Sequence, residues 1–281
     1  MKTITAEEAA TLINHNDNVG FSGFTHAGCP KVVPQALAKR AEVEHREGRP
    51  FKIGIFTGAS TGDRIDGALS RADAIKFRTP YQTNNDIRQA INSNTISYFD
   101  LHLSSLAQDL RYGFYGNIDV AIIEAADVTD SGEIIPTCGV GMTPTIAKMA
   151  KFVIVELNKW HPKELRGMHD LLDLQDPPFR QPIDITNVKS RIGKEYIQVD
   201  PSKIVIVETN EPNDGGGFAP VDEITSKIGD NAAGFLVNEI RKGTILKSFL
   251  PIQSGVGNIA NAVLFAMGNN KNIPDFEVYT E

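Results

Sequence analysis

The residues with the clearest chemical potential lie at the end of the sequence. Gly255, Val256 and Gly257 form a glycine loop between a short apolar run and a helical pattern. An alternating run follows at 276–281 and ends in the acid Glu281. A strand, a glycine loop that opens a helix, and a second strand carrying an acid form a unit that can build a site.

One interpretation of this unit is a dinucleotide site. Gly255, Gly257 and Ala260 match the G-x-G-x-x-A spacing, and Glu281 on the next strand would then bond to a ribose hydroxyl. The loop comes late in the chain, whereas the dinucleotide fingerprint usually opens its domain. Because alanine is allowed at the third position, spacing alone leaves a nucleotide-dependent oxidoreductase open.

In the other interpretation, Glu281 is a carboxylate nucleophile and the loop amides around Val256 form part of an oxyanion hole. Carboxylate attack on a thioester gives an acyl anhydride and needs no metal. Cys29 and Cys138 show no metal-binding spacing with the six histidines, which is compatible with that chemistry. A nucleophile pair of Cys29 with His26 is disfavoured, because no orienting acid is evident.

A second candidate site is the loop 22–30 near the start of the chain. Gly23 and Gly28 let the backbone approach a ligand, and Pro30 suits the first turn of the helix that follows. The N-terminus of that helix favours an anion, so Gly28 is a candidate binding residue. The alternative is a tight turn from strand to helix that binds nothing.

Other polar segments carry weaker signals. The small-residue loop 57–63 lacks the lysine of a phosphate-binding loop, and we expect it to line the same crevice as the first loop. Segments 78–82 and 98–102 mix polar and aromatic residues; either could form a pocket wall, and both are interpreted as domain surface. His161 and His169 show no metal spacing and are interpreted as surface or hydrogen-bonded core residues.

The elements that position these residues predict an α/β fold. Short apolar runs flanked by helical patterns indicate a largely parallel sheet buried on both faces and flanked by helices. The turn at 130–132 predicts a local hairpin on that sheet. The expected strands are 18–24, 51–56, 120–123, 152–157 and 203–208.

The clearest boundary is a segment rich in glycine and proline. We expect an N-terminal α/β domain over 1–210, a linker over 211–220, and the beginning of a second, truncated α/β domain over 221–281. One helix of the second domain is expected to end at Gly243. Its apolar face is predicted to consist of Ile224, Ile228, Ala232, Phe235, Leu236 and Ile240.

The composition limits the classes of binding partner that we expect. A formal charge of −7, without a dense basic stripe, argues against nucleic acid. No apolar run has the length of a membrane span, and no signal peptide is evident. We therefore expect a protein of the cytoplasm without a membrane partner.

Two motifs resemble a known family. Family I CoA-transferases have a similar N-terminal glycine motif, which here is Gly23-Phe24-Thr25-His26-Ala27-Gly28-Cys29-Pro30. The acetyl-CoA hydrolase/transferase branch, which includes succinyl-CoA:acetate CoA-transferases, has motifs that resemble Gly255-Val256-Gly257-Asn258-Ile259-Ala260-Asn261-Ala262-Val263 and Tyr279-Thr280-Glu281. The resemblance covers essentially the whole chain.

The resemblance implies roles for these residues. Glu281 matches the catalytic glutamate, which forms a mixed anhydride and then a glutamyl-CoA thioester. Val256 matches the residue whose backbone amide contributes to the oxyanion hole. Gly255, Gly257, Asn258 and Gly28 are the residues we expect to contact coenzyme A.

The resemblance also implies which molecules bind to the protein and how much of a family member this chain represents. It implies acyl-CoA and small carboxylates as substrates, no tightly bound cofactor, and a homodimer. Family members have two α/β domains facing a cleft, so we expect this chain to be a fragment with negligible turnover by itself. A non-catalytic CoA-binding lobe remains the alternative from outside enzyme chemistry.

Overall fold

The fold is described from a computed structural model, in which residues 1–184, 187, 190–212, 220–248, 252–255, 257–276 and 278–279 are described. The chain divides into two compact units. The first comprises Met1–Asp184 with Arg191–Asp214, and the second comprises Gly215–Glu281 with Ile185–Ser190. Val256 and Glu281, the two residues with predicted catalytic roles, lie outside the described residues.

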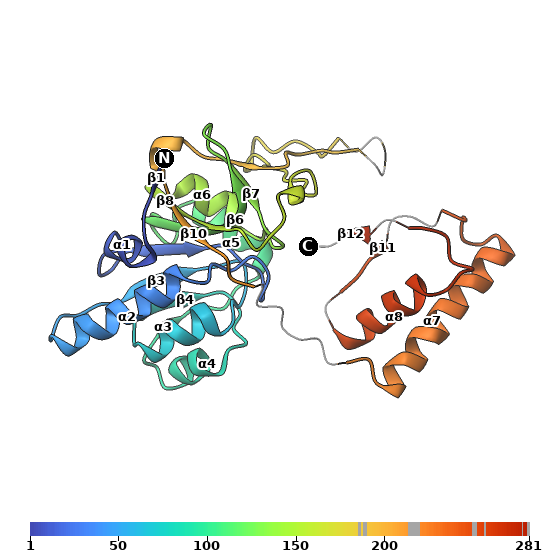
Figure 1. Ribbon diagram of the computed structural model, residues 1–281, viewed down its shortest axis with the longest axis horizontal. Coiled ribbons are helices and arrows are strands. Elements are labelled where there is room, and N and C mark those ends of the chain that lie inside the picture. Colours follow the sequence, from blue (N-terminus) through green and yellow to red (C-terminus); the bar gives the residue numbers. More distant parts are fainter. Residues whose placement is uncertain are drawn as a thin grey trace. The chain divides into compact units, whose positions relative to one another are not determined.

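The first unit is built on one sheet with the strand order β1-β10-β8-β6-β2-β3-β4-β5 (Figure 1). Every neighbouring pair along this order is parallel, which confirms the predicted parallel sheet. In that order the strands are β1 (Lys2–Thr3), β10 (Ile204–Thr209), β8 (Phe152–Asn158), β6 (Val120–Val128), β2 (Asn18–Phe21), β3 (Ile53–Phe56), β4 (Ile75–Thr79) and β5 (Ser97–Tyr98).

Helices cover both faces of this sheet. Along β6, Val120 and Ile122 belong to one buried cluster, and Ala121 and Ile123 belong to another, because successive side chains of a strand point to opposite faces. The two clusters explain why the strands are nearly continuous apolar runs. The helices are α1 (Ala6–Thr11), α2 (Val33–Arg46), α3 (Ala68–Arg71), α4 (Asn85–Asn92), α5 (Leu103–Arg111) and α6 (Thr143–Met149).

In Figure 1, α2 and α3 lie on the opposite side of the strands from α6. Consistent with this, α2 packs into the first buried cluster and α6 into the second. The predicted local hairpin is confirmed, because β6 pairs antiparallel with β7 (Glu133–Pro136). Thr5 and Glu8 form a reciprocal capping box at the start of α1.

The segment 78–82 was predicted to be surface, and that prediction is wrong for most of it. Arg78 lies on β4 with its side chain fully buried, and Gln82 is also buried, while Tyr81 alone is exposed. A buried arginine is stable here because Asp66 pairs with it, a partner that the local pattern does not reveal. The segment 98–102 is exposed or half-buried, as predicted.

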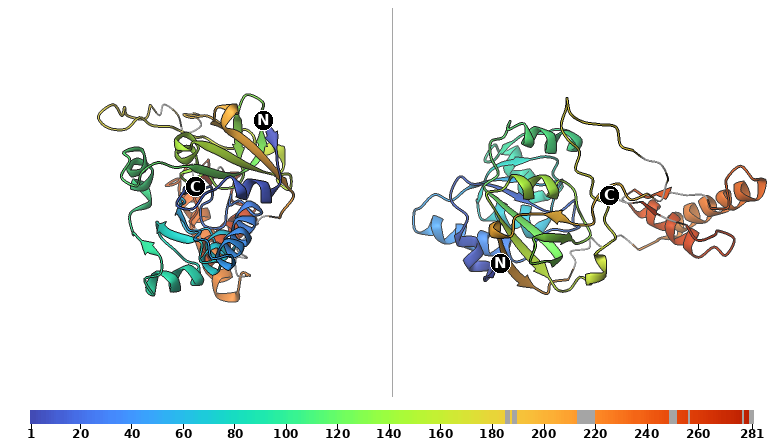
Figure 2. Two further views of the ribbon diagram at one scale, coloured as in Figure 1. Left: turned by 90° about the vertical axis from the view of Figure 1, so that its left-hand side faces the viewer. Right: turned by 90° about the horizontal axis from the view of Figure 1, so that it is seen from above.

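After β8 the chain leaves the sheet as a long extended loop before it returns at β9 (Ile197–Gln198), which pairs with β7 (Figure 2). Short 3-10 helices lie at η2 (Lys163–Leu165) and η3 (Pro201–Lys203). Arg111 of α5 holds this loop through two hydrogen bonds to the carboxylate of Asp176, at 2.8 and 2.6 Å. A two-pronged arginine–carboxylate pair of this kind fixes the loop geometrically.

The second unit contains α7 (Glu223–Lys242), α8 (Asn258–Gly268) and the parallel strands β11 (Ile252–Gln253) and β12 (Val278–Tyr279). The helix α7 ends at Gly243 in the left-handed conformation, as predicted, with φ at 77°. The hydrophobic core of the second unit includes Ala233, Val237, Met267 and Ile273.

The predicted apolar face of α7 is wrong for Ile224, Ile228 and Phe235, which are exposed, whereas Leu236 packs against the core of this unit. Ile224 is 72% exposed and Phe235 is 62% exposed, whereas Gly229, Ala233 and Val237 are buried. The reason is close helix packing: a Cβ on Gly229 would lie 2.5 Å from the Ala262 carbonyl oxygen of α8. Small residues therefore define the contact, and a search for large apolar residues misses them. Among the residues described, no helix is long and apolar enough to cross a bilayer.

Candidate active site

Three small-residue loops meet at the carboxyl edge of the first unit's sheet. Loop 22–30 follows β2, loop 57–62 follows β3, and loop 137–142 follows β7. A Cβ on Gly28 would lie 2.8 Å from the Gly139 carbonyl oxygen, and a Cβ on Gly58 would lie 3.1 Å from the Gly23 carbonyl oxygen. The loops thus touch through their backbones, and ligands of parallel α/β sheets collect at this edge.

Gly28 itself needs glycine for two reasons. Its φ is +71°, which is strained for other residues, and Gly139 leaves no space for a side chain. The sequence pointed to Gly28 but not to Gly139. A usable signal was present, because Gly139-Val140-Gly141 follows a strand and precedes a helix in the same way as Gly255-Val256-Gly257.

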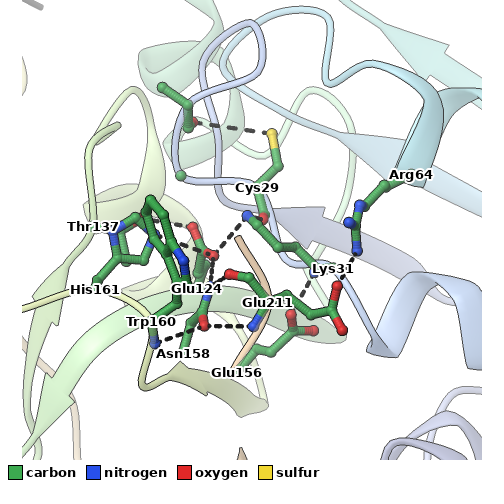
Figure 3. A network of polar contacts seen from close by, with 12 residues as sticks. Cys29, Lys31, Arg64, Glu124, Thr137, Glu156, Asn158, Trp160, His161 and Glu211 are labelled. Atoms are coloured by element: carbon green, nitrogen blue, oxygen red, sulfur yellow. Dashed lines mark hydrogen bonds and ion pairs between the residues drawn. The ribbon is translucent and has the colours of Figure 1, made fainter. Parts of the chain in front are cut away.

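A buried charged cluster lies beneath loop 22–30 (Figure 3). The Glu124 carboxylate accepts hydrogen bonds from Lys31 Nζ at 2.7 Å, Thr137 Oγ1 at 2.7 Å and Asn158 Nδ2 at 2.8 Å. The side chains of Lys31 and Glu124 have no exposed surface. Burial raises the pKa of Glu124, but the nearby His161 ring, the charge of Lys31 and the hydrogen bonds from Lys31 and Asn158 outweigh it and leave the pKa below its usual value.

Glu156 occupies the N-terminus of α2. Its carboxylate accepts hydrogen bonds from the backbone amides of Lys31, Val32 and Val33, with the last at 3.0 Å. Burial raises the pKa of Glu156 to about 7 despite these bonds, and the charge of Glu124 adds to the rise. A carboxyl group of the protein itself therefore occupies the helix N-terminus at which an anion was expected.

The hydrogen bonds of the same cluster extend to Glu211, in the segment that follows β10. Asn158 donates to the Glu211 carbonyl oxygen at 2.8 Å and accepts from the Glu211 amide at 3.0 Å. The Glu211 carboxylate in turn pairs with Arg64 Nη1 at 3.0 Å. Sequence reasoning named none of these residues, because they come from distant parts of the chain.

A second buried ion pair shapes loop 57–62. Arg78 Nε lies 2.9 Å from the Asp66 carboxylate, and both side chains are fully buried. The same carboxylate accepts hydrogen bonds from the amide and the hydroxyl of Thr61, at 2.7 and 2.9 Å. The Ser60 hydroxyl accepts from the Thr83 amide at 3.1 Å. This loop is therefore held rigidly beside Gly23 and Gly28.

Cys29 and three histidines of the first unit lie against neighbouring loops and side chains. Cys29 is fully buried, and its thiol lies 3.5 Å from the Thr25 carbonyl oxygen. The ring of His26 lies against Gly62. His161 is buried with Nε2 at 3.7 Å from Glu124, and the ring of His169 hydrogen-bonds the Pro136 carbonyl oxygen at 3.2 Å. Within the described residues, no cluster of three or more potential ligands could hold a metal ion.

In the second unit the structure describes part of the predicted site. Gly257 precedes α8 with φ at +140°, Asn258 is the first residue of that helix, and Gly255 is exposed. Strands β11 and β12 are parallel, and Gln253 pairs with Tyr279.

The α/β fold matches solved structures of other proteins. RipA from Yersinia pestis superimposes with a TM-score of 0.65 at 18% identity, covering 100% of this chain and 56% of RipA. A 4-hydroxybutyrate CoA-transferase from Porphyromonas gingivalis gives a TM-score of 0.53 at 19% identity, covering 100% of this chain and 54% of that protein. At this identity the likeness shows the fold alone.

Sequence comparison then gives the family. The profile of the acetyl-CoA hydrolase/transferase N-terminal domain matches residues 1–208. The chain is 45% identical over 279 residues to the propanoyl-CoA:succinate CoA transferase of Escherichia coli K12, covering 99% of the chain and 57% of that relative. It is 44% identical over 281 residues to the succinyl-CoA:acetate CoA-transferase of Clostridium kluyveri, covering 100% of the chain and 52% of that relative.

An acetyl-CoA hydrolase of Yarrowia lipolytica is 39% identical over 290 residues, covering 100% of the chain and 55% of that relative. The chain belongs to the acetyl-CoA hydrolase/transferase family. It spans about half the length of the curated relatives that it matches.

Proposed function

We propose that this chain carries the nucleophile of an acyl-CoA:carboxylate CoA-transferase, with Glu281 as that nucleophile and the Val256 amide as an oxyanion donor. The observation that carries the proposal is the parallel pairing of β11 with β12. In this pairing Gln253, two residues before Gly255 in the sequence, lies beside Tyr279, two residues before Glu281 in the sequence. The resemblance of the glycine loop and of the final strand to the family's motifs supports the same roles.

The chemistry we propose proceeds in balanced steps. The Glu281 carboxylate attacks the acyl carbonyl carbon, the carbon–sulfur bond breaks, and coenzyme A leaves as the thiolate while a mixed anhydride forms. The thiolate then attacks the glutamyl carbonyl and releases the donor's carboxylate, which leaves a glutamyl-CoA thioester. An acceptor carboxylate reverses these steps, so the free energy of the thioester is retained.

Each attack places negative charge on a carbonyl oxygen. Backbone amides that already point at this oxygen stabilise it without reorganisation, and removing one such donor typically costs about 10²–10³ in kcat. Gly255 and Gly257 give the loop the backbone freedom to present the Val256 amide in this way. The side chain of Val256 is not used.

The same intermediates would react with water. The relatives include proteins named as CoA-transferases and proteins named as acetyl-CoA hydrolases. Hydrolysis would result wherever water reaches the anhydride or the glutamyl thioester, so water exclusion decides between the two outcomes. We propose transfer between small carboxylates as the main activity.

We further propose that turnover requires a part of the fold that residues 1–281 do not supply. The support is coverage, since the alignment spans 57% and 52% of the two CoA-transferase relatives. The chain alone is expected to show negligible transfer from succinyl-CoA to acetate. Measurable transfer by the purified chain would contradict this expectation.

The proposal is tested in a chimera that joins this chain to the residues of the Escherichia coli relative beyond the matched span. With acyl-CoA present, borohydride should reduce the thioester and mark the peptide that contains Glu281, as read by mass spectrometry. Glu281→Gln should abolish both the label and the transfer, while Glu277→Gln, on the same strand run, should keep both. An active chimera with unlabelled Glu281 would exclude the covalent mechanism.

Two other functions, CoA binding without catalysis and dinucleotide binding, predict different results for the same chimera. Binding of acyl-CoA without transfer by the chimera would favour a non-catalytic CoA-binding lobe. Binding of NADH, seen as a fluorescence change, would favour a dinucleotide site at the loop 254–257. Membership of the hydrolase/transferase family favours neither of them.

A further inference from the structure

Glu124 connects the ends of three different strands and the loops that follow them. Its carboxylate receives hydrogen bonds from Lys31, after β2, from Thr137, after β7, and from Asn158, at the end of β8. Glu124 itself is 1% exposed. A buried carboxylate is costly unless its oxygens are satisfied, and three donors satisfy this one.

Two consecutive carbonyl groups of loop 22–30 depend on Glu124. Lys31 Nζ, which pairs with Glu124, also donates to the Cys29 carbonyl oxygen at 2.8 Å. The Glu124 amide donates to Ser22 Oγ at 2.9 Å, and this hydroxyl donates to the Gly28 carbonyl oxygen at 2.6 Å. The side chain and the backbone of one residue therefore fix the peptide groups beside Gly28.

Glu124 also fixes the opposite side of the same contact. Thr137, which donates to Glu124, lies two residues before Gly139. Gly139 is the residue whose backbone touches Gly28 so closely that no Cβ fits between them. Glu124 thus supports both sides of this contact, the Gly28 side through its backbone amide and Lys31, and the Gly139 side through its carboxylate.

We propose that Glu124 is a positioning residue for acyl-CoA binding, which holds the peptide groups of Gly28 and Gly139 at the carboxyl edge of the first unit's sheet, the edge where ligands of parallel α/β sheets collect. This inference rests on the proposed function. Glu124 touches no reacting atom in this role; it acts through Lys31, Ser22 and Thr137. Because these contacts form within the first unit, the positioning can be tested on the chain itself.

The test compares two variants that separate charge balance from positioning. Glu124→Gln leaves Lys31 as a buried cation without its carboxylate, which destabilises the fold. The double variant Lys31→Met/Glu124→Gln removes both charges and should recover much of the lost melting temperature. It does not restore the Lys31 bond to the Cys29 carbonyl oxygen, so the loop should remain loosened.

Amide hydrogen exchange of the whole chain, analysed by mass spectrometry, is the first measurement. Peptides covering 22–33 and 137–142 should exchange at least about tenfold faster in both variants than in the wild type. The control is Glu133→Gln. It removes the half-buried carboxylate of Glu133 on β7, which pairs with Arg166, and should leave the exchange rates of both peptides unchanged. Unchanged protection in Glu124→Gln overturns the proposal, as does recovery of protection in the double variant.

Transfer kinetics in the chimera described above are the second measurement. Misplaced peptide groups should lower kcat by about tenfold or more, with KM for acyl-CoA changed much less, in both variants. Recovery of kcat together with melting temperature in the double variant would show a role in stability alone and overturn the proposal. A wild-type chimera without transfer overturns the proposed function instead, and the exchange result still decides whether Glu124 positions the loops.

Discussion

Lys31 and Glu124 form an ion pair of 2.7 Å in which neither side chain has exposed surface, although 93 positions separate them in the sequence. The pair lies beneath the loop that carries Gly28, and Glu156 fills the N-terminus of the adjoining helix. The glycine loop is therefore supported by buried charges of the protein itself. The predictions below separate the effects of backbone strain, burial and charge.

Replacement of Gly28 by alanine should lower the free energy of unfolding of the first unit by about 3 kcal/mol, from left-handed strain plus a clash with Gly139. Gly48→Ala is the matched control, since its φ of +73° resembles that of Gly28 but no atom lies within 4 Å of the added Cβ. It should cost only about 1 kcal/mol. Urea unfolding followed by the fluorescence of Trp160, the single tryptophan, measures both. Equal losses in the two variants would contradict the proposed clash.

Asp66→Asn should destabilise the first unit by about 3–5 kcal/mol, because it leaves the buried Arg78 guanidinium without a carboxylate. Asp63→Asn removes the carboxylate from a surface pair with Arg71 and should cost less than about 1 kcal/mol. Thermal unfolding monitored by circular dichroism gives both values. A similar effect of the two changes would show that burial of the Asp66 pair does not matter.

Glu156 should make the first unit less stable as pH rises from 4.5 to about 7. The folded carboxyl binds its proton up to a higher pH than the unfolded one, so the folded state holds more protons across this window and the free energy of unfolding falls with rising pH. The change is on the order of 3 kcal/mol. Urea titrations at several pH values should show that Glu156→Gln removes this slope.

The half-exposed carboxyl of Glu208 on the neighbouring strand β10 provides the control. Glu208→Gln should keep the slope between pH 4.5 and about 7 that Glu156 produces. The lowered pKa of Glu124 acts in the opposite sense, and the stability that it provides is lost only at more acidic pH. An unchanged slope in Glu156→Gln would mean that this carboxyl does not titrate in that window.

In the second unit, Gly229→Ala should destabilise the contact between α7 and α8, because its Cβ would lie 2.5 Å from the Ala262 carbonyl oxygen. Gly234→Ala, on the same helix with nothing within 4 Å of the added Cβ, should instead stabilise α7 by up to about 1 kcal/mol. Hydrogen exchange of peptides from 223–242 reports on both changes. Changes of the same sign would contradict this packing.

Local sequence patterns determined much of the fold. The capping box of Thr5 and Glu8 and the hairpin between β6 and β7 follow from residue types a few positions apart. Continuous apolar runs indicated a parallel sheet covered on both faces, since both faces of each strand are buried. Gly28 was singled out by its place in a glycine loop between a strand and a helix, and its φ of +71° is one that glycine adopts without strain.

Tertiary structure decided the pairings. Lys31 with Glu124, Arg78 with Asp66, and Gly28 with Gly139 are brought together by strand order and register, which no local pattern encodes. The same is true of α7, where Gly229 faces its neighbour and Ile224 does not. Periodicity reports which residues favour burial, but only packing decides which of them are buried. The roles of Glu281 and Val256 come from sequence motifs alone, because both residues lie outside those that the structure describes.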